Sequence, residues 1–95
     1  MTEPYVIVNN EDNEQFEIVL ERERAFLEYR WYKNSLALMH TFVPDSIGGK
    51  GLASALAAHA FEYAKSRKIK VRIYCSFVAD YIKQHPEYNH LVDKF

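Results

Sequence analysis

The segment from His40 to Arg67 reads HTFVPDSIGGKGLASALAAHAFEYAKSR and holds all three glycines of the chain, Gly48, Gly49 and Gly51. Glycine loses more backbone entropy on folding than any other residue, so it is costly in regular structure. Its clustering between a strand-like run and an alanine-rich run therefore indicates a place where the backbone turns tightly or is approached closely.

An amphipathic helix is predicted from about Lys50 onward. Apolar side chains recur there at spacings of three and four, which places them along one face of a helix. That face consists of Leu52, Ala55, Leu56, His59, Ala60, Tyr63 and Ala64. Lysine and arginine at positions 65–68 suit the negative end of the helix dipole. The many alanines let this helix lie close against a sheet.

Four strand-like runs precede the glycines. The first is rich in β-branched residues, and the others alternate between apolar and polar side chains. They cover residues 5–9, 15–21, 25–32 and 35–43. A helix over 23–33 is the alternative for the third run, but its alternation and aromatic content favour a strand. Short polar connections join antiparallel neighbours, so the four runs predict an antiparallel meander.

The fourth run, SLALMHTFV, ends directly before Pro44. Strict alternation predicts Leu36, Leu38, His40 and Phe42 on one face of this strand. Pro44 has no N–H to donate, so it stops the ladder there.

A fifth strand is predicted over residues 69–75 and a second helix over 76–85, ended by Pro86. We expect the tail, with Tyr88, Leu91, Val92 and Phe95, to fold back onto the body. A strand–helix–strand crossover is nearly always right-handed and makes its two strands parallel. The prediction is therefore an α+β fold, an antiparallel meander followed by a β-α-β crossover and a C-terminal helix.

Composition excludes several classes of protein. The net charge of −1 argues against a protein that binds nucleic acid, because such proteins usually carry a basic bias. The single cysteine allows no internal disulfide and favours a reducing, cytoplasmic compartment. The N-terminal residues lack a signal-peptide pattern, and no apolar run approaches the ~20 residues of a membrane span. We therefore expect no membrane partner.

The glycines suit the binding of an anion. The first amides of a helix have no internal partner, and together with the helix dipole they attract phosphate. Glycines there let a pyrophosphate reach the amides, and Lys50 adds a positive charge. The stretch matches neither the Walker A spacing nor the dinucleotide-binding fingerprint. A plain structural turn is the alternative reading.

Two longer motifs resemble the short, single-domain branch of the GNAT-type N-acetyltransferases. They read HTFVPDSIGGKGLASAL and IYCSFVADYIKQHPEY. The branch pattern is roughly H-T-x-V-P, then G-K-G-x-A, then C-S-F-V, and then P-x-Y. The matching residues are His40, Thr41, Val43, Pro44, Gly49, Lys50, Gly51, Ala53, Cys75, Ser76, Phe77, Val78, Pro86 and Tyr88. Ser46 stands where the general motif has Gln or Arg.

The resemblance implies that residues 1–95 form one minimal GNAT-like domain that binds acetyl-coenzyme A. In such folds the fourth and fifth strands splay apart, and the pantetheine arm pairs with the free backbone of the fourth strand. The pyrophosphate lies on the amides of the glycine loop. The coenzyme-binding residues implied are Thr41, Phe42, Val43, Gly48, Gly49, Lys50, Gly51, Leu52, Ala53 and Ser76.

Acetyl transfer needs a neutral amine, polarisation of the thioester carbonyl and a proton for the departing thiolate. Two candidates for these roles are His40, as a general base, and Cys75, as an acid or a transient acetyl carrier. Both the chemistry of the residues and the family resemblance point to them. Tyr81 is a further candidate, because many GNAT folds protonate the thiolate with a tyrosine in that helix. The alternatives are a buried hydrophobic cysteine, a hydrogen-bonded sheet histidine and a core tyrosine.

The remaining histidines carry no predicted chemistry. His59 lies on the apolar helix face and is expected to be packed, while His85 and His90 are expected at the surface. No spacing of His, Cys, Asp and Glu indicates a metal site.

The acceptor is left undefined by the sequence. Larger GNAT proteins have helices after the first strand and extra strands after the last helix, and this chain has neither. The acceptor is therefore an unidentified amine, either a small molecule or a protein lysine or N-terminus, and the oligomeric state is open. An N-acetyltransferase is the first hypothesis. A coenzyme-A-binding sensor or interaction module with little turnover is the second.

Overall fold

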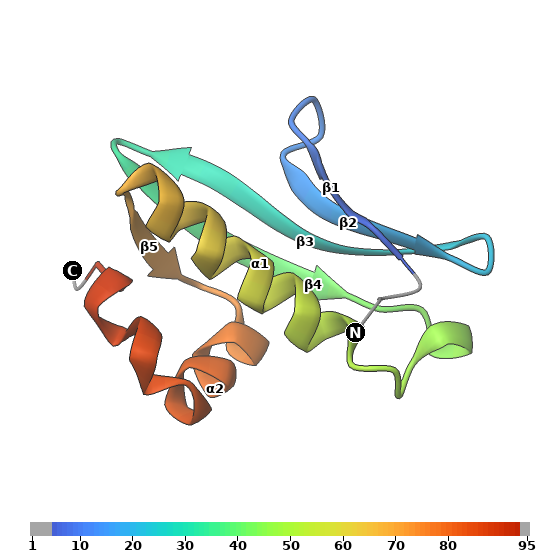
Figure 1. Ribbon diagram of the computed structural model, residues 1–95. Helices are drawn as coiled ribbons and strands as arrows, with labels where there is room; N and C mark the ends of the chain where they lie inside the picture. Colours follow the sequence, from blue (N-terminus) through green and yellow to red (C-terminus); the bar gives the residue numbers. More distant parts are fainter. Residues whose placement is uncertain (1–4, 94–95) are drawn as a thin grey trace.

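The computed structural model describes residues 5–93, which form one five-stranded sheet with its helices on one side (Figure 1). The strands are β1 (Ile7–Asn10), β2 (Gln15–Leu20), β3 (Glu23–Tyr32), β4 (Ser35–Phe42) and β5 (Lys70–Ile73). The helices are α1 (Leu52–Arg67) and α2 (Ser76–Gln84), with 3-10 turns η1 (Asp45–Ile47) and η2 (Pro86–Leu91). The predicted α+β fold is confirmed.

The sheet follows the order of the chain, β1-β2-β3-β4-β5. The first four strands pair antiparallel, and β4 pairs with β5 in parallel. Helix α1 connects that parallel pair, as the β-α-β prediction required. Residues 5–93 contain no helix long and apolar enough to cross a membrane.

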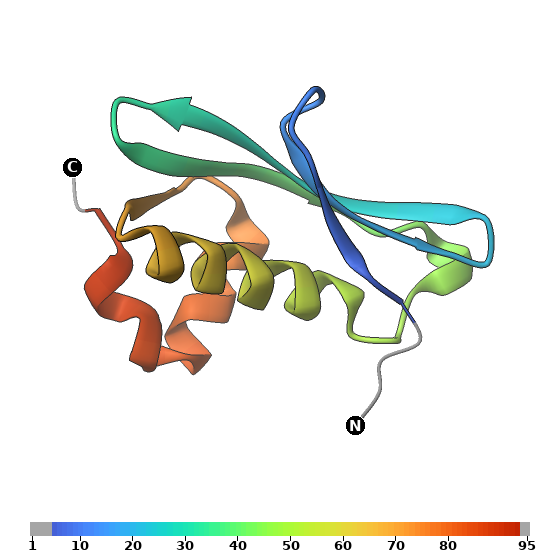
Figure 2. The ribbon, with the colours of Figure 1, turned by 45° about the horizontal axis from the view of Figure 1, so that its top comes forward.

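The core lies between the sheet and α1 (Figure 2). From β2 and β3, Phe16, Ile18, Ala25, Leu27 and Tyr29 are all buried in this core. Helix α1 contributes Leu52, Leu56, Ala57, Ala60, Phe61 and Ala64. Ala57 and Phe61 were outside the predicted face, and they are buried because α2 and η2 cover the flank of α1.

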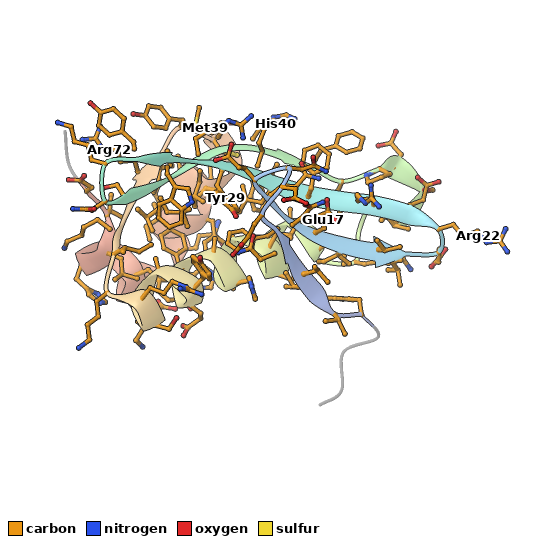
Figure 3. All side chains as sticks on the ribbon, turned by 90° about the horizontal axis from the view of Figure 1, so that it is seen from above. Glu17, Arg22, Tyr29, Met39, His40 and Arg72 are labelled. Carbon is orange, nitrogen blue, oxygen red and sulfur yellow. The ribbon has the colours of Figure 1, made fainter. Side chains whose placement is uncertain are left out.

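The face assigned to β4 from strict alternation is wrong after Leu38. Glu28 pairs with His40 and Tyr29 pairs with Leu38, so Met39 is an extra residue that faces no partner on β3. Such a β-bulge shifts every later side chain to the opposite face. Leu36 and Leu38 are fully buried, whereas His40 and Phe42 are exposed. Figure 3 shows Met39 and His40 on the side of the sheet away from the helices.

The fifth strand is also shorter than predicted. It ends at Ile73, and Cys75 is the residue that caps the start of α2. The C-terminal segment does fold back, since Leu91 is buried and the Asp93 N–H donates to the Val71 carbonyl at 2.8 Å. Phe95 lies outside the described residues.

Candidate functional site

The glycine loop, residues 48–51, follows the η1 turn, which begins after Pro44, two residues beyond the end of β4 at Phe42. Ile47, the last residue of η1, is fully buried in the core. This burial anchors the start of the glycine loop. Gly49 and Gly51 then adopt left-handed backbone conformations, with φ of 76° and 75°. Residues other than glycine rarely adopt the left-handed backbone region, so the turn that leads into α1 depends on both glycines.

Helix α1 begins with exposed amides. Gly51 is its N-cap, and within the described chain no side-chain hydrogen bond caps this end. The first intrahelical bond runs from the Ala55 N–H to the Gly51 carbonyl at 3.0 Å, which leaves the amides of 52–54 without helical acceptors. A Cβ placed at Gly49 or Gly51 would meet no atom within 4 Å, so the space above these amides is open.

That space is a cleft of about 230 Å³, which we call the glycine cleft. Its lining residues are Val43, Gly48, Gly49, Gly51, Leu52, Ala53, Ser54 and Phe77. The cleft therefore joins the end of β4, the glycine loop, the first turn of α1 and the first turn of α2. Uncapped amides at a helix N-terminus bind anions, above all phosphate groups.

Strands β4 and β5 separate beside this cleft. They pair only over Ser35–Leu38 and Lys70–Ile73. The N–H groups of Tyr74 and Cys75 both donate to the Leu38 carbonyl, at 2.9 and 3.1 Å, and there the contact ends. From His40 to Phe42, β4 remains paired with β3 alone, so the edge of β4 that faces β5 is open within residues 5–93.

Cys75 lies at the fork between the two strands. The thiol is buried, and its Sγ lies 3.2 Å from Thr41 Oγ1, with either atom able to donate. Thr41 reaches Cys75 because the bulge turns this side chain, and not that of His40, toward the helices. From the sequence, Thr41 is expected to contact the coenzyme through its backbone. Nothing in the sequence indicates the contact between the Thr41 side chain and Cys75.

His40 lies on the opposite face of β4. It stands across from Glu28 in the ladder, and its ring centroid lies 6.3 Å from that of Phe26. Adjacent residues of a strand point to opposite faces, so the structure does not bring the side chains of His40 and Cys75 together. Phe42, which lies 5.6 Å from Phe26, faces outward with His40.

Tyr81 is packed away from the cleft. Its ring stacks on His85 at 4.1 Å and on Phe61 at 6.2 Å. Burial, followed by the charges of Glu87 and Glu62, raises the pKa of Tyr81 above the ordinary value of a tyrosine. The hydroxyl therefore keeps its proton at neutral pH, but the cleft residue that α2 supplies is Phe77.

The other predicted coenzyme contacts fall at or near the cleft. Lys50 is exposed and its Nζ lies 3.7 Å from the Glu21 carboxylate. Ser76 is the exposed first residue of α2, next to Cys75. His59 contacts Phe16 edge-on at 5.1 Å, and burial lowers its pKa, as suits the packed histidine expected.

The comparisons with known proteins agree with this arrangement. The family model described as GCN5-related N-acetyltransferase matches residues 15–91, which is most of the chain. The chain belongs to this family. The match includes the bulged strand, the glycine loop and both helices.

Two relatives and one solved structure are similar to this chain. Protein NATD1 of Mus musculus is 30% identical over 86 residues, covering 87% of this chain and 78% of the mouse protein. Protein NATD1 of Xenopus tropicalis is 34% identical over 65 residues, covering 67% of this chain and 60% of the frog protein. The solution structure of a GCN5-like protein from Staphylococcus aureus superposes with a TM-score of 0.75 at 23% identity. It covers 99% of this chain and 93% of that one, so the two share the fold.

Sequence reasoning missed two residues that line the cleft. Phe77 was matched only as a residue of the C-S-F-V motif and was given no role at the site, yet it is 36% exposed and lines the cleft. Ser54 lines the cleft as well, one position beyond the predicted set. The position of Ser54, three residues into a helix that no side chain caps, is the signal that could have identified it.

Proposed function

We propose that this chain binds acetyl-coenzyme A at the glycine cleft and transfers the acetyl group to an amine. The observation that carries the proposal is the uncapped amino end of α1, which opens directly beside the unpaired stretch of β4. The amides of 52–54 would hold the diphosphate, and the backbone of Thr41–Val43 would pair with the amide-bearing arm. Membership of the GCN5-related family supports the same reading.

Acetyl-coenzyme A would supply the acetyl group as a thioester. In this proposal the two proton transfers take place on opposite sides of β4. We assign to His40, on the open face, the role of accepting the proton of the incoming amine, and to Cys75, on the helix face, that of donating a proton to the leaving thiolate. Tyr81, with its raised pKa, is a second donor candidate, although its contacts with Phe61 and His85 are those of a packed residue.

The coenzyme site can be tested with a matched pair of variants at Gly51. Asn and Asp have the same shape and tolerate left-handed backbone better than other side chains, so Gly51→Asn and Gly51→Asp make similar demands on the fold. Only Asp adds a negative charge at the amides. We expect Gly51→Asp to bind coenzyme A at least about tenfold more weakly than Gly51→Asn in titration calorimetry. Equal affinities in two folded variants would remove the phosphate role.

Turnover is tested separately from binding. Incubation with acetyl-coenzyme A and a pool of amines should release free thiol, and intact-mass analysis would reveal acetylation of the protein itself or of Cys75. Binding without thiol release would leave a coenzyme-binding module in place of an enzyme.

A further inference from the structure

A second cleft lies toward the other end of α1 and encloses about 470 Å³. The β1–β2 turn, β3 and α1 contribute its lining, which consists of Glu11, Asp12, Glu14, Tyr29, Trp31 and Tyr63. Along the helix axis, Tyr63 is roughly 16 Å from Leu52 at a rise of about 1.5 Å per residue. This cleft, which we call the aromatic cleft, is therefore separate from the glycine cleft.

Trp31 and Tyr63 form one wall of the aromatic cleft, over the buried ring of Tyr29. Tyr29 and Trp31 share a face of β3, and their centroids lie 6.1 Å apart at an interplanar angle of 76°. Phe16 supports the wall, at 5.0 Å from Tyr29 and 5.4 Å from Tyr63. The Trp31 side chain is 46% exposed, so part of the indole is available to a ligand. The face of an aromatic ring attracts cations.

Carboxylates form the other wall. The Tyr29 N–H donates to the Glu14 carbonyl at 2.9 Å, and this bond holds the β1–β2 turn beside the rings. Glu14 pairs with Arg30 at 3.7 Å, whereas within residues 5–93 neither Glu11 nor Asp12 forms an ion pair. Burial, and then the nearby Tyr63, Glu11 and Glu14, raise the pKa of Tyr29, as expected in an anionic surrounding.

We propose that the aromatic cleft binds an alkylammonium cation, with its charge against the carboxylates and its carbon groups against the Trp31 ring. No lysine or arginine is among the described lining residues, so an anionic ligand would be repelled. The Arg67 guanidinium already lies 4.5 Å from the centre of the Tyr63 ring, so a cation of the chain occupies one edge of this wall. Tyr29 is 1% exposed and Trp31 is 46% exposed, so the Trp31 ring is the one available to a ligand. The proposal does not depend on acetyl transfer.

The single tryptophan makes the test direct, because the indole N–H of Trp31 gives one nuclear magnetic resonance signal from a residue that lines the cleft. The probes are choline and its neutral analogue 3,3-dimethyl-1-butanol, titrated at constant ionic strength. We expect a saturable shift of the Trp31 signal with choline, with a dissociation constant on the order of 1 mM. A response to the neutral alcohol equal to that to choline, or no response to choline, would overturn the proposal.

Charge-matched variants separate the cleft from the overall charge of the protein. Glu11→Gln/Asp12→Asn removes two negative charges from the cleft, and Asp80→Asn/Glu87→Gln removes two exposed charges from α2 and η2. We expect the first variant to bind choline about fivefold or more weakly, and the second to stay within about twofold of the natural chain. Equal weakening in both variants would show only a general charge effect and would contradict the proposal.

The source of the cation is resolved by a second probe. A capped tripeptide with a central trimethyllysine carries the same cation as choline on a polypeptide. Binding of both probes would admit protein side chains, and binding of choline alone would restrict the cleft to small amines. Binding of neither contradicts the proposal.

Discussion

Thr41 contacts Cys75 because Met39 is an extra residue in β4. The bulge leaves Leu38 facing inward and makes Thr41 the next inward side chain, 3.2 Å from the thiol. His40 then faces the open side of the sheet with Phe26 and Phe42. The His40 and Cys75 side chains therefore lie on opposite sides of the sheet.

Substitution of Cys75 tests its role in proton transfer. Cys75→Ala removes the donor, whereas Cys75→Ser keeps an O–H at the same position. We expect the alanine variant to lower kcat by about a hundredfold, the usual scale for loss of a general acid, and the serine variant to fall between. Affinity for coenzyme A, measured by calorimetry, should stay within about twofold. An unchanged kcat in Cys75→Ala would show that the thiol only fills space.

At the scale of elements, η2 explains two motif residues to which the proposed chemistry gives no role. Pro86 begins this turn, and Tyr88 stacks on Phe61 of α1 at 5.0 Å. The Tyr88 hydroxyl donates to the Glu62 carboxylate at 2.7 Å. The chain then pairs along β5 through Val92 and Val71. The P-x-Y motif thus fastens the C-terminal segment to α1.

Tyr88→Phe tests this fastening. The bond to Glu62, first, and burial raise the pKa of Tyr88 to about 12, against about 10 in an unfolded chain. The raised pKa means that the folded state favours the neutral phenol. Its contribution to the stability of the fold is therefore complete below about pH 10 and is lost as the pH rises toward 12. We expect Tyr88→Phe to lower the free energy of unfolding by about 1 kcal/mol at pH 7.5 in urea titrations. The difference from the natural chain should shrink at pH 11. A constant difference would contradict the assignment.

The elements were largely predictable from the sequence because their periods are clear. Alternation in residues 15–32 favours strands over the helix that residues 23–33 also allow, and the three- and four-residue spacing after Gly51 favours a helix. The crossover rule then predicts the parallel pair. The bulge was not predictable, since Met39 has no feature that distinguishes it from a regular strand residue. The error in the face of His40 followed from that single position.

The candidate site was predictable only in part. The glycine loop was found because its residue type reports a backbone demand, and two of its φ values are indeed left-handed. Contacts between distant residues carry no such local signal. The Thr41–Cys75 pair and the aromatic cleft, which joins the β1–β2 turn to the last turns of α1, depend on the three-dimensional arrangement.

At the scale of the whole molecule, the helices and 3-10 turns that cover the sheet do so from one side. Both clefts border α1, with the glycine cleft at its amino end and the aromatic cleft near its carboxyl end. The glycine cleft lies between the end of β4, the glycine loop and the first turns of α1 and α2. A ligand there would contact all of these segments at once.

Coenzyme A should therefore raise the melting temperature. A ligand at about 100 times its Kd adds about 2.7 kcal/mol to the stability of the folded state, which for a domain of this size is roughly 10 °C or more in Tm. The Gly51→Asp variant at the same concentration should show about half this shift or less, while Gly51→Asn should retain more of it. Thermal scans with and without the ligand check this, and identical shifts in both variants would argue for binding elsewhere.

The bulge at Met39 changes which positions of β4 face the core, the even-numbered or the odd-numbered ones. Up to Leu38 the even positions belong to the inner layer, and from Thr41 onward the odd positions do. A shorter sequence that lacked this one residue would keep every neighbouring side chain in the same layer, with an uninterrupted ladder. When such chains are aligned, the gap belongs at Met39, and the residues that follow are correctly indexed by counting backward from Pro44.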